Sequence, residues 1–220
     1  MDNASYQREV LNLAGLDMLN LCISQIEKAK VAFLTHDTDL AEEVINTENR
    51  VNALDLKIEK DCEKFIALYN PVAIDLRFIM AMRKINFDLE RIADHAYGIS
   101  RYVVDIDKKI PRHLIKAVEL KKMYETISSM FQHVVDAYEN KNVKIARKVF
   151  KKDKIVDGIN VKSFDIIEQE IKKDSNIIAE ALILFSVVKK LERVGDLIKN
   201  IAEEIIFYID AEVLKHKRKK

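Results

Sequence analysis

Two short stretches, LERIAD at residues 89–94 and LERVGD at residues 191–196, repeat one pattern 102 residues apart. Each contains Leu-Glu-Arg, an aliphatic residue, a small residue and Asp in the same order. Each also lies within a run of apolar residues that are spaced three and four apart. This spacing places side chains on one stripe of an α-helix. The repeat therefore predicts two copies of one helical unit.

The apolar stripes around these stretches match position by position. In the first half the stripe consists of Met82, Ile85, Leu89, Ile92, Ala96, Ile99 and Val103. In the second half it consists of Leu184, Val187, Leu191, Val194, Ile198, Ile201 and Ile205. An earlier segment repeats at an offset of 105, where Val44 and Val51 correspond to Val149 and Val156. Such spacing, sustained over several turns, is typical of helices packed in a bundle.

Composition and turn signals predict the fold. The 220 residues are 49% apolar and 33% charged, with only four Gly and two Pro. Few turn formers favour long helices over a sheet. We expect six helices, over residues 4–34, 38–68, 71–107, 112–139, 142–172 and 175–214, with Asp37 or Thr38 as an N-cap and Pro71 in the first helical position. The predicted fold is all-α, with two pseudo-symmetric three-helix bundles at residues 1–108 and 109–220.

Pairs of oxygen-bearing side chains four residues apart recur in both halves. They are Glu90/Asp94 and Glu192/Asp196 on the third helices, and Glu48/Asn52 and Asp153/Asp157 on the second helices. Like charges at this spacing cost a helix roughly 0.2–0.5 kcal/mol, and a bound cation would offset that cost. Carboxylates without His or Cys at ligand spacing favour Mg²⁺, Ca²⁺, Mn²⁺ or iron.

The same acids have an ordinary interpretation. Glu90 and Asp94 lie nearly opposite the apolar stripe of their own helix, so we expect them on the outer surface. They then form either a surface cation site or a solvated face in which Arg91 pairs with Asp94. Acids four apart are common in so charged a chain, and residue type alone favours the solvated face. We expect His95 to be a surface histidine.

Several functional classes lack support in the sequence. It contains no P-loop, HExxH or GxSxG motif, and no Glu-x-x-His pattern of buried di-iron bundles. Without the basic tail KHKRKK at residues 215–220, 36 acidic residues outnumber 32 basic ones, so we expect no nucleic-acid partner. We expect the tail to be a solvated helix end.

The expected compartment follows from three features. Cys22 and Cys62 lie in apolar helical patterns, which favours reduced core cysteines. The N-terminus has no signal-peptide pattern. The longest apolar stretch, ALILFSVV at residues 181–188, is too short to span a bilayer. We therefore expect a soluble intracellular protein.

Taken together, the segments resemble the PhoU family. The resemblance rests on the two Glu-Arg-x-x-Asp stretches and on YNPVAIDLRFIMAMRKINFDLERIAD at residues 69–94. It also rests on VINTENRVNALD at residues 44–55 and VFKKDKIVDGIN at residues 149–160. These segments occur in the family's order, and the match covers about residues 8–210. A single Glu-Arg-x-x-Asp is weak evidence, whereas the ordered set is specific.

The resemblance implies an all-α cytoplasmic regulator of phosphate uptake and phosphate-starvation signalling that is not an enzyme. PhoU-like proteins act at the inner face of the membrane on the ATPase subunit of a Pst-type phosphate transporter and on a sensor histidine kinase. Many form homodimers, and some bind multinuclear metal clusters through acidic pairs that correspond to the four pairs above. Asn52 departs from the family pattern because an amide brings no charge, so we expect the first-half site to be the weaker one.

Two alternatives remain beside this regulatory hypothesis. One is a structural helical adaptor, serving another transporter, whose acids only form a solvated face. The other is a carboxylate-metal enzyme or a metal-storage bundle.

Overall fold

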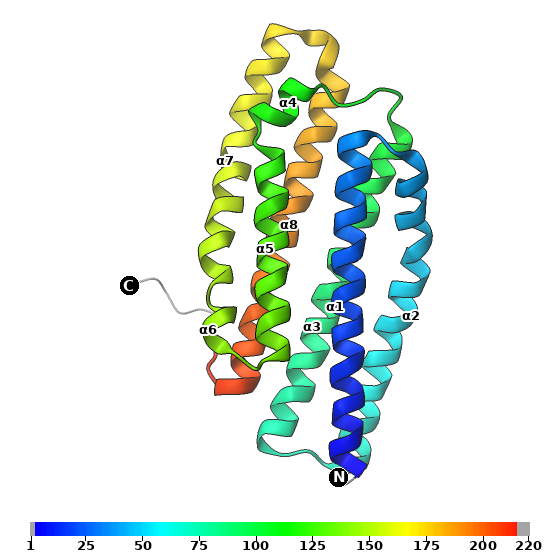
Figure 1. The fold of residues 1–220 in the computed structure, drawn as a ribbon, viewed down its shortest axis with the longest axis vertical. Coiled ribbons are helices and arrows are strands. Elements are labelled where there is room, and N and C mark those ends of the chain that lie inside the picture. Colours follow the sequence, from blue (N-terminus) through cyan, green and yellow to red (C-terminus); the bar gives the residue numbers. More distant parts are fainter. Residues whose placement is uncertain (1–2, 215–220) are drawn as a thin grey trace.

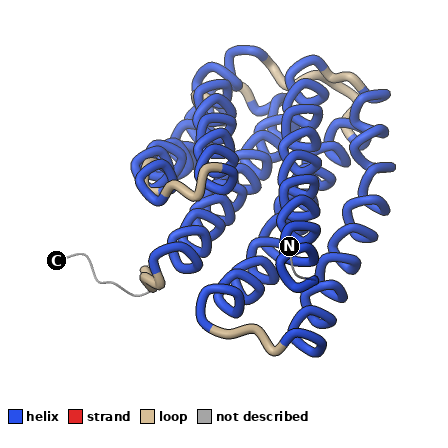
Figure 2. Tube along the Cα trace, turned by 60° about the horizontal axis from the view of Figure 1, so that its bottom comes forward, coloured by secondary structure: helices blue, strands red, loops and turns tan. Residues whose placement is uncertain are grey.

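The computed structural model describes residues 3–214, and the regular structure in that range is entirely helical (Figure 2). The long helices are α1 (Asn3–Thr35), α2 (Thr38–Tyr69), α3 (Ala73–Asp105), α5 (Leu120–Glu139), α7 (Val149–Lys173) and α8 (Ile178–Asp210). The short elements are α4 (Arg112–Ala117), α6 (Val143–Ala146) and the 3₁₀ turn η1 (Ser175–Ile177). The all-α prediction with six long helices is confirmed.

The helices form two bundles that meet along their third long helices. α1, α2 and α3 pack against one another, as do α5, α7 and α8. α3 and α8 lie side by side between the two groups, while α2 and α7 occupy the two outer edges (Figure 1). The boundary predicted between residues 108 and 109 falls in the connection between α3 and α4.

Burial explains why the two halves adopt one plan. Every residue of the two predicted stripes on α3 and α8 is at most 3% exposed. Full burial of one aliphatic side chain contributes about 1.5–3 kcal/mol, so these stripes are the centre of the core. Cys22 and Cys62 are also buried and unpaired, as expected.

Helix starts agree with the sequence in one case and differ in another. Asp37 caps α2, with Oδ1 accepting a hydrogen bond from the Leu40 N–H at 3.0 Å. The prediction that the third helix opens at Pro71 is wrong, because α3 begins at Ala73. Asn70 ends α2 in the left-handed conformation, at φ 44°. The chain then uses Pro71 and Val72 to reverse direction before α3.

Two helices predicted as continuous are interrupted in the second half. The range 112–139 breaks between α4 and α5, where Glu119 has φ 55°. The range 142–172 breaks after Ala146, and α7 starts at Val149. Neither break contains Gly or Pro, the residues that usually mark such sites.

None of the helices within residues 3–214 combines the length and apolar character needed to cross a bilayer. The basic tail at residues 215–220 lies outside the described range, and so does the expectation made for it.

Candidate cation sites

The four predicted pairs form two clusters, one in each half. The first-half cluster consists of Glu48 and Asn52 on α2 with Glu90 and Asp94 on α3. The second-half cluster consists of Asp153 and Asp157 on α7 with Glu192 and Asp196 on α8. Within each half, the second and third long helices therefore bring their pairs to one place, which helix spacing alone did not establish.

The second-half cluster has the geometry of a cation site. Asp153, Asp157 and Asp196 each offer a carboxylate oxygen, and these oxygens lie within 4.8 Å of one another. The Asp153 side chain is only 8% exposed, and its Oδ1 has no hydrogen-bond partner. A buried carboxylate oxygen without a partner is costly, so this atom fits a ligand position.

Gly195 allows α7 to approach α8 at this cluster. A Cβ at this position would lie 3.3 Å from Cγ1 of Val156 and 3.6 Å from Oδ1 of Asp153. Val156 is fully buried and belongs to the apolar face of α7. The small residue of LERVGD therefore serves close helix packing.

A lysine that the sequence analysis did not single out lies within the second-half cluster. The Nζ of Lys199 donates to Oδ2 of Asp153 at 2.7 Å and to Oδ1 of Asp196 at 2.5 Å. Lys199 follows Asp196 by three residues on α8, so this pair could have been found from helix spacing. Its contact with Asp153, 46 residues away, depends on the packing of α7 against α8.

Electrostatics in the second half reflect crowded acids with one internal cation. Burial raises the pKa of Asp153, and the Lys199 ammonium opposes that change. Burial also raises the pKa of Glu192, with the negative charge of Asp196 as the next cause. The cluster therefore favours either protons or a bound positive charge.

The first-half cluster has no equivalent lysine. Burial, followed by the close Asp94 carboxyl, raises the pKa of Glu48 to about 7, and a hydrogen bond from Asn52 partly offsets this. Burial and Asp94 likewise raise the pKa of Glu90. Within the described part of the chain, no Lys or Arg forms an ion pair with these three acids. Tyr97 occupies the place that Lys199 has in the second half.

The expected outer-surface position is confirmed for Asp94, which is exposed, whereas Glu90 is half-buried. Two acids of the second half lie deeper. Asp153 is buried, and the Glu192 side chain is only 20% exposed. The angle between these acids and the apolar stripe of their own helix takes no account of the neighbouring helices. In the fold, α2 and α7 pack along the flanks of α3 and α8 and cover part of the side expected to face solvent.

Two neighbouring side chains also differ from expectation. Arg91 forms no ion pair with Asp94 in the described structure. Its guanidinium lies over the Phe87 ring, 5.6 Å from the ring centre. His95 is half-buried rather than on the surface, and burial followed by the nearby Lys190 lowers its pKa to about 4. His95 is therefore neutral near pH 7.

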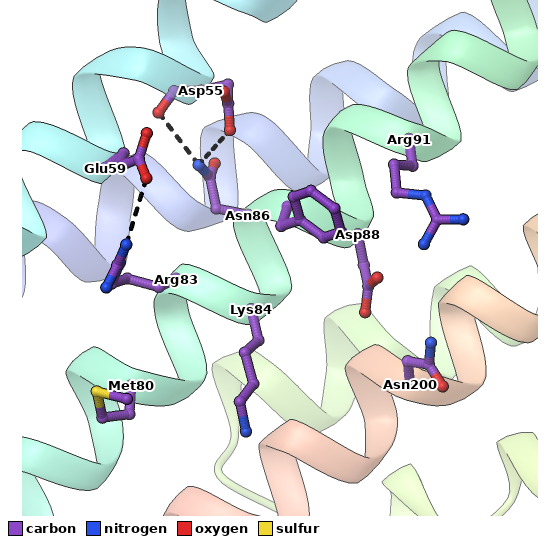
Figure 3. Close-up of a pocket in the computed structure, with 10 residues that line it drawn as sticks. Asp55, Glu59, Met80, Arg83, Lys84, Asn86, Asp88, Arg91 and Asn200 are labelled. Atoms are coloured by element: carbon purple, nitrogen blue, oxygen red, sulfur yellow. Dashed lines mark hydrogen bonds and ion pairs between the residues drawn. The ribbon is translucent and has the colours of Figure 1, made fainter.

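An open groove of about 520 Å³ is lined by residues of α2 and α3 together with Asn200 of α8 (Figure 3). Asn86 donates to Asp55 Oδ1 at 2.6 Å along one side of the groove, and Arg83 pairs with Glu59 at 3.3 Å. Lys84, which also lines the groove, pairs with Glu204 at 3.1 Å. Arg91 is a third cation of the groove, but Asp55, Glu59 and Asp88 also line it, so three acids balance the three cations and the groove carries no net positive charge for a phosphate ion.

The donor set suits hard divalent cations. All eight predicted residues offer carboxylate or amide oxygens, the ligands that Mg²⁺, Ca²⁺, Mn²⁺ and iron accept readily. The unpaired Oδ1 of Asp153 and the short distances around it fit such an ion. The ammonium of Lys199 shows that the cluster already stabilises a positive charge.

Comparisons with known proteins place these features in context. The PhoU domain family matches this chain twice, over residues 16–103 and 120–205. A relative from Thermotoga maritima, named phosphate-specific transport system accessory protein PhoU homolog 1, is 30% identical over 94% of this chain and 90% of its own length. A PhoU homolog from Zymomonas mobilis is 32% identical over 80% of this chain and 73% of its own. The crystal structure of PhoU from Pseudomonas aeruginosa covers 94% of this chain and 99% of its own, with a TM-score of 0.89 at 27% identity.

Proposed function

This chain belongs to the PhoU family, and from that premise we propose that it is a non-catalytic accessory protein of a phosphate transport system. The observation that carries the proposal is the double match, because both family domains fall on bundles that repeat the same acidic helix pair. Its relatives are named accessory proteins of phosphate-specific transport, which supports a regulatory rather than a catalytic role.

The proposal extends to partners and compartment. We place the chain in the cytoplasm, bound to the ATPase subunit of a Pst-type phosphate transporter and to a sensor histidine kinase that reports phosphate starvation. Contact with the membrane is then peripheral and passes through these partners. The expected homodimer is part of the same proposal. The names of the relatives support an association with a phosphate transport system.

The two acidic clusters are proposed to hold divalent cations. In the first half, Glu48, Asn52, Glu90 and Asp94 would supply the oxygens. In the second half, Asp153, Asp157, Glu192 and Asp196 would do so. A bound ion, whether iron, manganese, magnesium or calcium, supplies positive charge that offsets the repulsion between acids of neighbouring helices. The protein's own contribution is to hold α2 beside α3, and α7 beside α8, so that acids from two helices meet in each cluster.

The test is made in cells that lack the native gene. We expect phosphate-starvation genes to be expressed in phosphate-rich medium, and the wild-type chain to repress them again. Affinity purification of the tagged chain should recover the transporter ATPase subunit and the kinase. The proposal would be overturned if the chain failed to repress the phosphate-starvation genes in phosphate-rich medium and recovered neither protein.

A matched pair of variants connects the clusters to this function. Glu192→Ala/Asp196→Ala removes two cluster acids from α8 and should weaken repression. Glu168→Ala removes an exposed α7 acid that pairs with its helix neighbour Lys172, so it should behave as wild type. Equal repression by both variants would separate the regulatory role from cation binding.

A further inference from the structure

The two clusters share one plan but differ in whether a lysine lies among the acids. The 102-residue offset that places Glu90 on Glu192 and Asp94 on Asp196 also places Tyr97 on Lys199. Tyr97 is half-buried and ends in a phenol, whereas Lys199 carries an ammonium into the acids. The second half therefore contains a tethered cation where the first half has none.

The position of this ammonium is specific. It contacts one acid from each helix, at 2.7 Å to Asp153 and at 2.5 Å to Asp196. The third acid, Asp157, offers an oxygen within 4.8 Å of theirs. The ammonium thus takes lone pairs that a divalent ion would need from two of the three closest ligands.

The ammonium leaves one ligand position unused. The Asp153 side chain is 92% buried, since only 8% is exposed, and Lys199 binds its Oδ2 alone. Its Oδ1 has no partner and is directed toward Gly195 on α8. The Asp153 carboxylate therefore keeps one buried acceptor oxygen that the Lys199 ammonium does not contact.

We propose that Lys199 is a built-in competitor that occupies the second-half acidic cluster and must move out before a divalent cation can bind there. This inference rests on the proposed cation binding and assigns the two halves different affinities. Asn52 alone would make the first-half cluster the weaker cation site. The proposal reverses that order of affinity, because the competing charge of Lys199 in the second cluster outweighs the charge that Asn52 lacks in the first. Divalent binding in the second half is then coupled to release of the Lys199 side chain and of its link between α7 and α8.

The size of the effect follows from competition. If the ammonium occupies the cluster about nine-tenths of the time, the apparent dissociation constant rises about tenfold. Removing the ammonium should therefore tighten divalent binding in the second half by about tenfold or more. The first half should be unaffected.

The experiment isolates the second half. The first-half cluster is disabled with Glu90→Ala/Asp94→Ala, and Mn²⁺ is titrated while free and bound ions are counted by electron paramagnetic resonance. This parent is compared with the same chain carrying Lys199→Met, or carrying Lys199→Gln if the methionine variant does not fold. Lys199→Arg keeps the charge. Lys122→Met is the control, because it removes an exposed lysine of α5 that pairs with Glu119, the residue before that helix. A second readout is the rise in melting temperature caused by Mn²⁺.

Tighter Mn²⁺ binding in Lys199→Met or Lys199→Gln, with parent-like binding in Lys199→Arg and Lys122→Met, would support the proposal. Equal binding by the parent and the Lys199→Met chain would overturn it and leave cation binding intact. The unmodified wild-type chain is titrated in parallel. If it and all variants bind no Mn²⁺, the cation sites of the proposed function fail together with this inference.

Discussion

Lys199 and Asp153 join α8 to α7, with Nζ of the lysine 2.7 Å from Oδ2 of the aspartate. Only 27% of the Lys199 side chain and 8% of the Asp153 side chain are exposed. Solvent therefore screens this ion pair less than a pair on the surface. Breaking it by removing one partner leaves a buried charge, which is strongly unfavourable.

The first prediction concerns this ion pair. In protein stripped of divalent cations, Lys199→Met should lower the free energy of unfolding by about 2 kcal/mol, because Asp153 loses its counter-ion. Asp153→Asn/Lys199→Met should recover part of that loss. Urea unfolding of the two single variants and the double variant gives the coupling energy. Strictly additive losses would show that the pair contributes nothing.

The second prediction uses two glycines in helices. A Cβ at Gly15 would lie 2.7 Å from Cε of Met82 and 2.7 Å from the Tyr138 hydroxyl oxygen. Gly15→Ala should therefore destabilise the protein by about 1–3 kcal/mol through overpacking where α1 meets α3 and α5.

Gly158 is the matched control for Gly15. A Cβ there meets no atom within 4 Å, so Gly158→Ala on α7 should stabilise the protein by about 0.5–1 kcal/mol through helix propensity. Both variants are compared by thermal and urea unfolding. The packing described for α1 would be contradicted if the two substitutions changed stability in the same direction.

The third prediction concerns pH. The pKa of Glu48 rises from 4.5 to about 7 in the folded protein, first through burial and then through Asp94. Between these values the folded state keeps a proton that the unfolded state has released, so stability falls as pH rises. Without divalent cations, Glu48→Gln should be more stable than wild type at pH 8, by on the order of 1 kcal/mol, since solvent screens this half-exposed site.

The Glu48 effect should disappear in acid. At pH 4 both states of the wild type hold the proton, and the two proteins should differ little through this group. Glu168→Gln, at an exposed acid of α7, controls for the general loss of one carboxylate. A difference between Glu48→Gln and wild type that stays constant from pH 4 to pH 8 would contradict the assigned pKa.

The sequence predicted most of the fold because the decisive signal is local. The stripes on α3 and α8 repeat every three or four residues, and each of their members is buried. The breaks before α5 and α7 were missed because Glu119 adopts a left-handed conformation without Gly, and because residues 147 and 148 carry no turn signal. Local propensity is a weak guide where tertiary packing decides the conformation.

The candidate sites were predicted in their residues but not in their geometry. Acids four apart on one helix share a face whatever surrounds them, so the pairs could be identified. Their burial depends on α2 and α7, which pack beside them from a different part of the chain. The contact between Lys199 and Asp153 spans 46 residues. Spacing within one helix carries no information on such a contact.

The most direct test of the account is the metal content of the wild-type protein, purified without chelators and measured by elemental analysis. We predict bound iron, manganese, magnesium or calcium. This metal should be lost when Glu90, Asp94, Glu192 and Asp196 are all replaced by Ala, and kept in Glu168→Ala. A metal-free wild-type protein, whose melting temperature responds to neither chelator nor added divalent cations, would contradict the claim that the duplicated acidic clusters are cation sites.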